Sequence, residues 1–184
     1  MRVGILVLSD RAARGERPDG SGPALAAWLE AHGARVVSRQ VLPDDAGAIR
    51  SCLCAWMDDR GHDLVLTCGG TGVAPRDVTP DATLAVVERI VPGLAESMRR
   101  ASSATSPHAA LSRAVAGIRG RCLVVNLPGS PRAALENLAA VWPALPHAVA
   151  KIQGDATECC SAGDVGSAGD VGPPPSTAHP PGDA

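Results

Sequence analysis

The sequence predicts an α/β fold in which a mostly parallel sheet carries helices on both faces. Short apolar runs, such as residues 2–8 and 63–67, alternate with longer segments that show helical periodicity. These runs are almost continuously apolar, which is typical of strands that are covered on both faces. Chains that alternate strands and helices form parallel sheets, whose ligands bind beyond the carboxyl ends of the strands. The loops that follow the strands are therefore the first candidates for a site.

The first half of the chain is expected to contain three strands and two helices. Pro23 suits the first turn of one helix and Gly33 suits its end. Asp44 or Asp45 is expected to cap the next helix, which Gly61 would end. The expected elements are a strand at 2–8, a polar loop at 9–20, a helix at 23–32, a strand at 36–42, a helix that carries Ile49, Leu53, Trp56 and Met57 on one face, and a strand at 63–67.

The second half is expected to open with a helix capped by Thr79, with Leu84, Val87 and Ile90 facing inward. The expected elements after it are a break at 92–93, a helix at 94–104, a loop at 102–112, strands at 114–118 and 121–125, a turn at 126–131 and a helix through 135–141. We expect one ordered domain, residues 1–157. Residues 158–184 repeat a Ser-Ala-Gly-Asp-Val-Gly unit and are rich in Gly and Pro, which predicts a disordered tail.

Composition narrows the classes of function. The chain has 184 residues, 45% hydrophobic content and no Phe or Tyr, so Leu, Val, Ile and Ala must fill the core. A net charge of −2 gives no bulk attraction to nucleic acid or to an acidic membrane. The first apolar run is too short for a signal peptide or a membrane span. The six cysteines show no zinc spacing. We therefore expect a cytoplasmic protein with reduced thiols that binds neither nucleic acid nor membrane.

The most informative segment is residues 67–81, in which a glycine-rich turn follows an apolar run. The sequence Gly69-Gly70-Thr71-Gly72 lets backbone N–H groups approach an anion, although such a turn can also be purely structural. Asp77 lies between this turn and the next helix, where a carboxylate suits Mg²⁺ bound together with substrate phosphates. Asp81 is a further candidate for binding the substrate, although it lies in the first helical turn, where the helix dipole alone explains an acid.

Other polar residues follow other expected strands. Ser9 and Asp10 leave the first strand and are candidates for binding the substrate. Asp44 follows the second strand, where Asp45 can act as the helix cap in its place. The remaining candidates for the rim of the site are Ser112, Asn126, Pro128, Gly129 and Ser130. Arg76, Arg113 and Arg132 are each able to meet a phosphate or to remain solvated charges.

These blocks together resemble the MogA/MoaB family of molybdopterin-binding proteins, over residues 2 to 155. The resemblance implies a three-layer α/β/α fold with one antiparallel strand, and a homotrimer. It also implies the transfer of AMP from ATP to molybdopterin with Mg²⁺ and release of pyrophosphate. By position, Asp44 and Asp77 match the two functionally critical aspartates of the family, here assigned to catalysis and Mg²⁺. The glycine turn and the 126–131 turn match its ligand-binding loops.

Three alternatives stay open from sequence alone. The first is a non-catalytic carrier that binds molybdopterin on the same fold. The second is processing of a different nucleotide by the same acids and glycine turn. The third is a scaffold for a later enzyme of the pathway, such as a molybdenum insertase.

Overall fold

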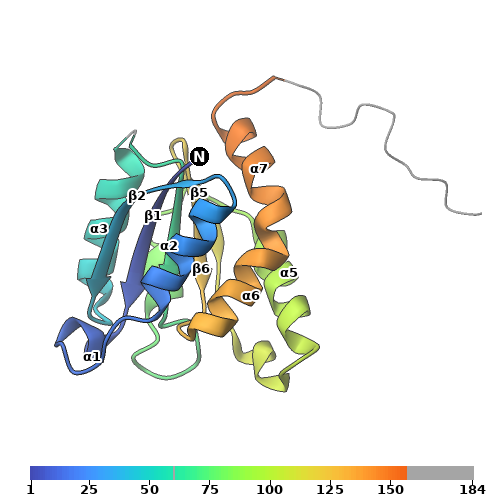
Figure 1. Ribbon diagram of the computed structural model, residues 1–184. Coiled ribbons are helices and arrows are strands. Elements are labelled where there is room, and N and C mark those ends of the chain that lie inside the picture. Colours follow the sequence, from blue (N-terminus) through green and yellow to red (C-terminus); the bar gives the residue numbers. More distant parts are fainter. Residues whose placement is uncertain (60, 157–184) are drawn as a thin grey trace, which may run out of the picture.

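The computed structural model describes residues 1–59 and 61–156, which form one six-stranded sheet flanked by helices (Figure 1). The order of strands across the sheet is β2-β1-β3-β6-β5-β4. β1, β2, β3 and β6 are parallel, and β5 runs antiparallel to both of its neighbours, so the expected single antiparallel strand is confirmed. The strands are β1 (Arg2–Leu8), β2 (Arg35–Leu42), β3 (Leu64–Cys68), β4 (Arg89–Ile90), β5 (Ala116–Arg119) and β6 (Cys122–Leu127).

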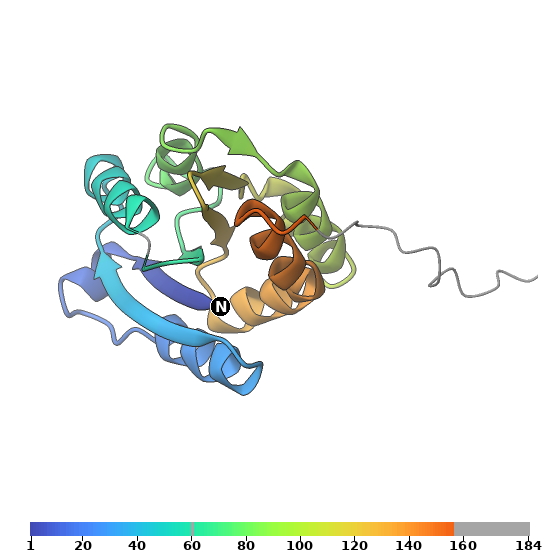
Figure 2. The same ribbon diagram turned by 90° about the horizontal axis from the view of Figure 1, so that it is seen from above.

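Helices cover both faces of the sheet, which gives the expected three layers. Viewed from above, α3 and α4 lie on one side of the strands and the other long helices on the opposite side (Figure 2). The first face carries α3 (Ala46–Asp58) and α4 (Thr79–Leu84), and the second carries α2 (Ser21–Ala31), α5 (Pro92–Ser103), α6 (Pro131–Val141) and α7 (Leu145–Ile152).

The core consists of two apolar clusters, one on each face of the sheet. Successive residues of a strand point to opposite faces. Ile5 accordingly packs with the cluster under α2, α5 and α6, whereas Leu6 packs with the cluster under α3 and α4. Val65 and Leu66 of β3 divide in the same way. This two-sided burial is the reason why these strands are apolar at every position rather than at alternate ones.

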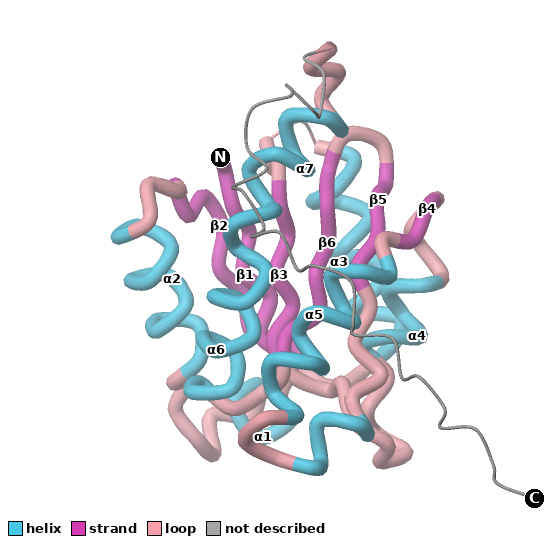
Figure 3. Tube along the Cα trace, turned by 90° about the vertical axis from the view of Figure 1, so that its right-hand side faces the viewer, coloured by secondary structure: helices cyan, strands magenta, loops and turns pink. Residues whose placement is uncertain are grey.

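The parallel strands end at one edge of the sheet, where the loops and the shortest helices gather (Figure 3). A short helix, α1 (Asp10–Ala13), follows β1, and Ser9 caps it by accepting a hydrogen bond from the Ala12 N–H at 3.3 Å. A 3-10 helix, η1 (Pro107–Leu111), follows α5. Both segments were expected to be loops. Local capping by Ser9 and Ser106 orders them, and the polar composition alone did not indicate this.

The segment after the glycine turn differs most from expectation. The predicted helix through Ile90 is wrong, because α4 ends at Leu84 and the chain leaves the helix to form the edge strand β4. Leu84 and Ile90 are 47% and 61% exposed rather than inward-facing. Thr79 is not a helix cap, since its hydroxyl instead donates to the Gly69 carbonyl at 2.8 Å. Pairing of β4 with β5 decides this region, and the local spacing of apolar residues, which favoured a helix, carries no information about such long-range pairing.

The other expected elements are present with shifted ends, and α2 begins at Ser21 rather than at Pro23. The predicted tail, residues 158–184, lies outside the described residues. No helix within the described ranges is long and apolar enough to cross a bilayer.

Candidate active site

Asp10 and Asp44 form a reciprocal pair at the ends of two neighbouring strands. Leu8 of β1 is in register with Leu42 of β2, so the residues that follow them lie abreast. The Asp10 N–H donates to Asp44 Oδ2, and the Asp44 N–H donates to Asp10 Oδ1, both at 3.1 Å. Asp45 caps α3 by accepting from the Ala48 N–H at 2.7 Å, as the sequence analysis allowed. Asp44 is therefore free of the capping role and faces the edge of the sheet.

Asp77 occupies a tight turn between the glycine turn and α4. Its Oδ2 accepts from the Ala74 N–H at 2.8 Å, and its own N–H donates to the Ala74 carbonyl at 2.9 Å. Arg113 brackets the turn from the other side, because its Nη1 donates to the Asp77 carbonyl at 3.2 Å and its Nη2 pairs with Asp81 at 2.5 Å. The Ala74 N–H thus holds the Asp77 carboxylate, and Arg113 holds the backbone of the same residue.

Two cavities open at this edge, and Asp77 lines both. We call the larger one, of about 680 Å³, the loop cavity, and the smaller one, of about 480 Å³, the helix cavity. Among the predicted site residues, the loop cavity is lined by Ser9, Asp44, Gly69, Gly70, Asp77, Gly129 and Ser130. The helix cavity is lined by Thr71, Gly72, Asp77, Ser112 and Pro128. The two aspartates, distant in sequence, therefore converge on one cavity.

The loop cavity has the features of an anion site. The first residues of two eleven-residue helices, Ser21 of α2 and Pro131 of α6, lie on its wall. Helix N-termini carry partial positive charge and unpaired N–H groups. Within the described ranges, the N–H group of Gly70, on the wall of this cavity, has no acceptor, and neither do those of Thr71 and Gly72, which line the adjoining helix cavity. The Gly69 N–H is excluded from ligand binding, because it donates to the Leu127 carbonyl at 3.0 Å.

The glycines of the turn are required by its geometry. Gly69 and Gly70 have φ angles of +118° and +60°, which L side chains rarely adopt. A Cβ on Gly69 would collide with the Leu8 carbonyl oxygen, and one on Gly70 would lie 3.1 Å from Asp44 Oδ1. The turn thus brings the backbone against the Asp44 carboxylate.

The pKa values of Asp44 and Asp10 are shifted in opposite directions. Partial burial, with Asp10 and Asp77 nearby, raises the pKa of Asp44. The pKa of Asp10 is lowered, chiefly by the hydrogen bond from Arg76. Burial raises the pKa of the Cys68 thiol to about 11, so this thiol stays protonated near neutral pH and is no nucleophile.

The donor set suits a divalent cation that is shared with a substrate. Asp44 and Asp77 each use Oδ2 for a backbone N–H, and their Oδ1 atoms accept no hydrogen bond from the described residues. No group of three or more His, Cys, Asp or Glu side chains within 1–59 and 61–156 is arranged to hold a metal. Mg²⁺ does not require such a cage, because one or two carboxylates with phosphate oxygens and water are enough.

Three predicted site residues lie away from the cavity walls. Asn126 is fully buried, and its amide bonds internally to Thr67, Thr83 and Val115. Asp81 is paired with Arg113, and Asp10 is paired with Arg76.

The three arginines considered for phosphate binding are all paired with acids. Arg76 is paired with Asp10, Arg113 with Asp81, and Arg132 with Glu136. Each of these pairs is at least partly exposed.

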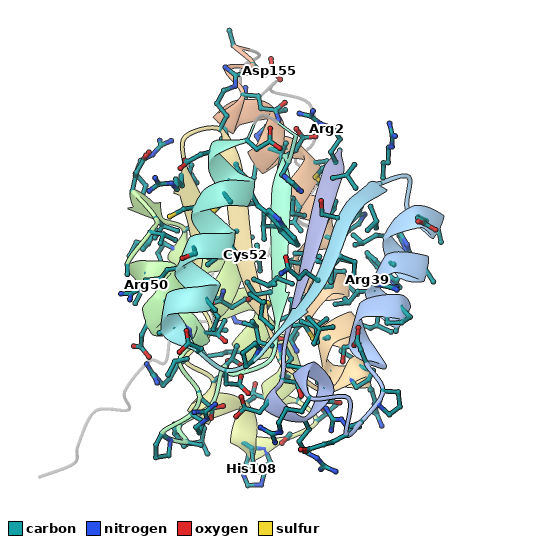
Figure 4. The ribbon with its side chains drawn as sticks, turned by 90° about the vertical axis from the view of Figure 1, so that its left-hand side faces the viewer. Arg2, Arg39, Arg50, Cys52, His108 and Asp155 are labelled. Atoms are coloured by element: carbon teal, nitrogen blue, oxygen red, sulfur yellow. The ribbon has the colours of Figure 1, made fainter. Side chains whose placement is uncertain are left out.

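Sequence reasoning missed several residues that line the cavities. Arg17, Asp19 and Ser21 line the loop cavity, and Asp19 orders the start of α2 by accepting from the Ser21 and Gly22 N–H groups. A polar stretch after β1 was visible, but nothing showed that it folds back over the cavity. The helix cavity is lined by Arg99, Ser102, Ser106, His108 and Asn137. His108 lies at the end of the molecule opposite Arg2 (Figure 4).

Comparison with known proteins agrees with this geometry. Residues 4–147 match the family described as "Probable molybdopterin binding domain". This chain belongs to the molybdopterin-binding domain family. A molybdopterin adenylyltransferase of Escherichia coli K12 is 44% identical over 143 residues, 77% of this chain and 73% of that protein. One from Helicobacter pylori J99 is 40% identical over 157 residues, 84% of this chain and 89% of that protein.

Solved structures of related proteins superpose on this chain and have the same fold. The molybdopterin biosynthesis enzyme MoaB from Thermus thermophilus superposes with a TM-score of 0.79 and 50% identity, over 83% of this chain and 96% of that one. A MogA structure superposes with a TM-score of 0.78 and 39% identity, over 83% of this chain and 99% of that one. The three-layer fold expected from the resemblance is thereby confirmed.

Proposed function

We propose that this member of the molybdopterin-binding domain family is a molybdopterin adenylyltransferase, which transfers AMP from ATP to molybdopterin in the synthesis of the molybdenum cofactor. Relatives that carry this activity in their names are 40% to 46% identical over most of the chain. The observation that carries the proposal is that Asp44 and Asp77 line one cavity beside an amide-rich turn. A pure carrier of molybdopterin has no need of two carboxylates there.

The two cavities suit the two parts of such substrates. The loop cavity, with its helix N-termini and free N–H groups, would hold phosphates. The helix cavity is bordered by Val73, Ala109, Leu111 and Ala133 and is suited to a flat heteroaromatic ring. Since Asp77 lies on the wall between the cavities, the reacting phosphates would meet beside it.

The reaction needs no protein nucleophile. An oxygen of the terminal phosphate of molybdopterin attacks the α-phosphorus of ATP, the bond from that phosphorus to the bridging oxygen breaks, and pyrophosphate leaves. The contribution of the protein is to align the two phosphates and to offset their charge. The turn at 70–72 and the start of α6 would do this with N–H groups that are already in place.

Asp44 and Asp77 are the residues that would hold Mg²⁺, through the Oδ1 atoms that no other group occupies among the residues described. When bound, the ion neutralises charge on the phosphates, which is worth several kcal/mol in the transition state.

We further propose a homotrimer, and a molybdenum insertase as the partner that receives the product. Both rest on the resemblance to the MogA/MoaB family. Light scattering after size-exclusion chromatography tests the first, and co-purification with an insertase tests the second.

The proposed activity is tested by pyrophosphate release from ATP with and without molybdopterin. We expect release that depends on molybdopterin. Asp44→Asn and Asp77→Asn should each lower it by at least about 100-fold, equivalent to about 3 kcal/mol of lost charge stabilisation. Asp45→Asn makes the same chemical change at the neighbouring position, and Asn caps helices as well as Asp does, so it should match the wild type. Release without molybdopterin, or full activity of Asp77→Asn, would contradict the proposal.

A further inference from the structure

We propose that Asp10 is a positioning residue that sets the spacing between Asp44 and Asp77, acting on Asp77 through Arg76. This inference rests on the proposed function, because it assigns Asp10 and Arg76 to the geometry of the same cation site. The sequence analysis expected Asp10 to bind substrate. In the structure, its side chain instead accepts hydrogen bonds from Asp44 and Arg76.

The first half of the link joins Asp10 to Asp44. Each of these residues accepts from the N–H of the other at 3.1 Å, so neither carboxylate can rotate without breaking a hydrogen bond to backbone. With Oδ2 of Asp44 held in this way, its Oδ1 is directed toward Gly70 and the glycine turn. Asp10 thereby fixes which oxygen of Asp44 remains available to a cation.

The second half joins Asp10 to the turn that carries Asp77. Oδ2 of Asp10 accepts from Arg76 Nη2 at 2.5 Å, and Arg76 directly precedes Asp77. The turn is stiff, because the Asp77 N–H donates to the Ala74 carbonyl and the Val78 N–H donates to the Arg76 carbonyl at 3.0 Å. The ion pair with Asp10 therefore anchors this turn, which carries Asp77, to the residues that follow β1.

One carboxylate thus uses its two oxygens for two different elements. Oδ1 holds the backbone at the end of β2, and Oδ2 holds the turn after β3. Asp10 itself is not among the residues on the loop cavity wall, whereas its neighbour Ser9 and both of its dependants, Asp44 and Asp77, are. Asp10 would therefore orient Asp44 and Asp77, and only those two residues would contact the ion.

A competing role for Arg76 is direct contact with an ATP phosphate, because its side chain is 65% exposed. The two roles differ in what Asp10 does. If Arg76 binds phosphate, Asp10 only competes for it, and removing the charge of Asp10 frees the guanidinium. If Arg76 positions Asp77, removing either partner has the same consequence.

The test measures Mn²⁺ binding by electron paramagnetic resonance, in the full chain with α,β-methylene ATP present. Asp10→Asn keeps an acceptor for the Asp44 N–H and removes the ion pair with Arg76. We expect Asp10→Asn and Arg76→Ala each to weaken Mn²⁺ binding about 10- to 100-fold, as residues that orient metal ligands do. The double variant should be no weaker than the weaker single variant, and Arg76→Lys should recover part of the affinity.

Two controls separate this effect from loss of structure. Asp58→Asn makes the same chemical change in another partly exposed ion pair, with Arg119, away from both cavities, and should bind Mn²⁺ like the wild type. Exposed pairs contribute little to folding, so Tm should fall by less than about 3 °C in every variant. Additive losses in the double variant, or wild-type affinity of Asp10→Asn beside a weak Arg76→Ala, would overturn the positioning role.

Adenylyl transfer by the wild type is measured in parallel, so that the two proposals fail separately. Transfer by the wild type with unchanged Mn²⁺ binding in the variants overturns the role of Asp10 alone. Linked losses of Mn²⁺ binding without any transfer by the wild type overturn the proposed activity and support the positioning role. Absence of Mn²⁺ binding by the wild type overturns both the cation site and the inference built on it.

Discussion

Replacing Asn126 by Leu tests whether this residue is a structural residue of the core or a ligand contact. Its side chain is fully buried between β3, α4 and the start of β5. Nδ2 donates to the hydroxyls of Thr67 and Thr83, both at 2.9 Å, and Oδ1 accepts from the Val115 N–H at 3.2 Å. Leu has a similar size and can make none of these bonds.

The expected cost follows from those three hydrogen bonds. Loss of the two bonds to threonine hydroxyls costs about 1 kcal/mol each, and a buried Val115 N–H without an acceptor costs a further 1–3 kcal/mol, roughly. The sum is about 3–5 kcal/mol, which at about 2–4 °C per kcal/mol lowers Tm by roughly 6–20 °C. Thr67→Val removes only one of the partners and should cost about 1–2 kcal/mol.

Urea unfolding followed by tryptophan fluorescence measures both variants, with calorimetry for Tm. A fall in the free energy of unfolding in the order wild type, Thr67→Val, Asn126→Leu is the predicted result. A loss below about 1 kcal/mol for Asn126→Leu would refute the reasoning, because a side chain that the core does not need is available to a ligand.

Two further predictions concern the opposite end of the sheet and the glycine turn. Burial opposes ionisation of Asp63, but hydrogen bonds from Arg2 outweigh it and lower its pKa. The ionised form is therefore stabilising above the ordinary carboxylate pKa of about 4 and loses this effect as pH falls further. Urea unfolding should show a steeper loss of stability below about pH 4 in the wild type than in Asp63→Asn; equal pH dependence would contradict this. Gly70→Ala should cost more stability than Gly33→Ala, because both have positive φ but only at Gly70 does a Cβ meet another residue, Thr79 Oγ1 at 2.5 Å. Equal losses would show that the turn has room for a side chain.

The fold was predictable where burial of a strand on both faces requires apolar residues throughout that strand. β1, β3 and β6 are covered on both faces, so nearly every residue of these strands is apolar or small. β4 could not be predicted, because Arg89 and Ile90 are held there by pairing with β5 across a long stretch of sequence. Spacing of apolar residues alone favoured a helix in that segment.

The site was predictable to the level of its loops, and less so to the level of single contacts. Chain direction places every loop after a parallel strand at one edge, so convergence of Asp44 and Asp77 followed from topology. Whether Asp10 faces the cavity or its neighbours depends on side-chain geometry that spacing does not encode. Arg99 and Asn137 reach the helix cavity from helices, where the packing of α5 on α6 decides which face is presented.

The central claim is that Asp44 and Asp77 hold a single cation beside the glycine turn. The most direct test is a crystal structure of the protein with Mn²⁺ and α,β-methylene ATP, with the metal located by its anomalous signal. We predict one Mn²⁺ in the loop cavity, at about 2.0–2.2 Å from an oxygen of each carboxylate and from a phosphate oxygen. A metal bound through phosphates alone, or at a position that reaches only one of the two aspartates, would contradict the account.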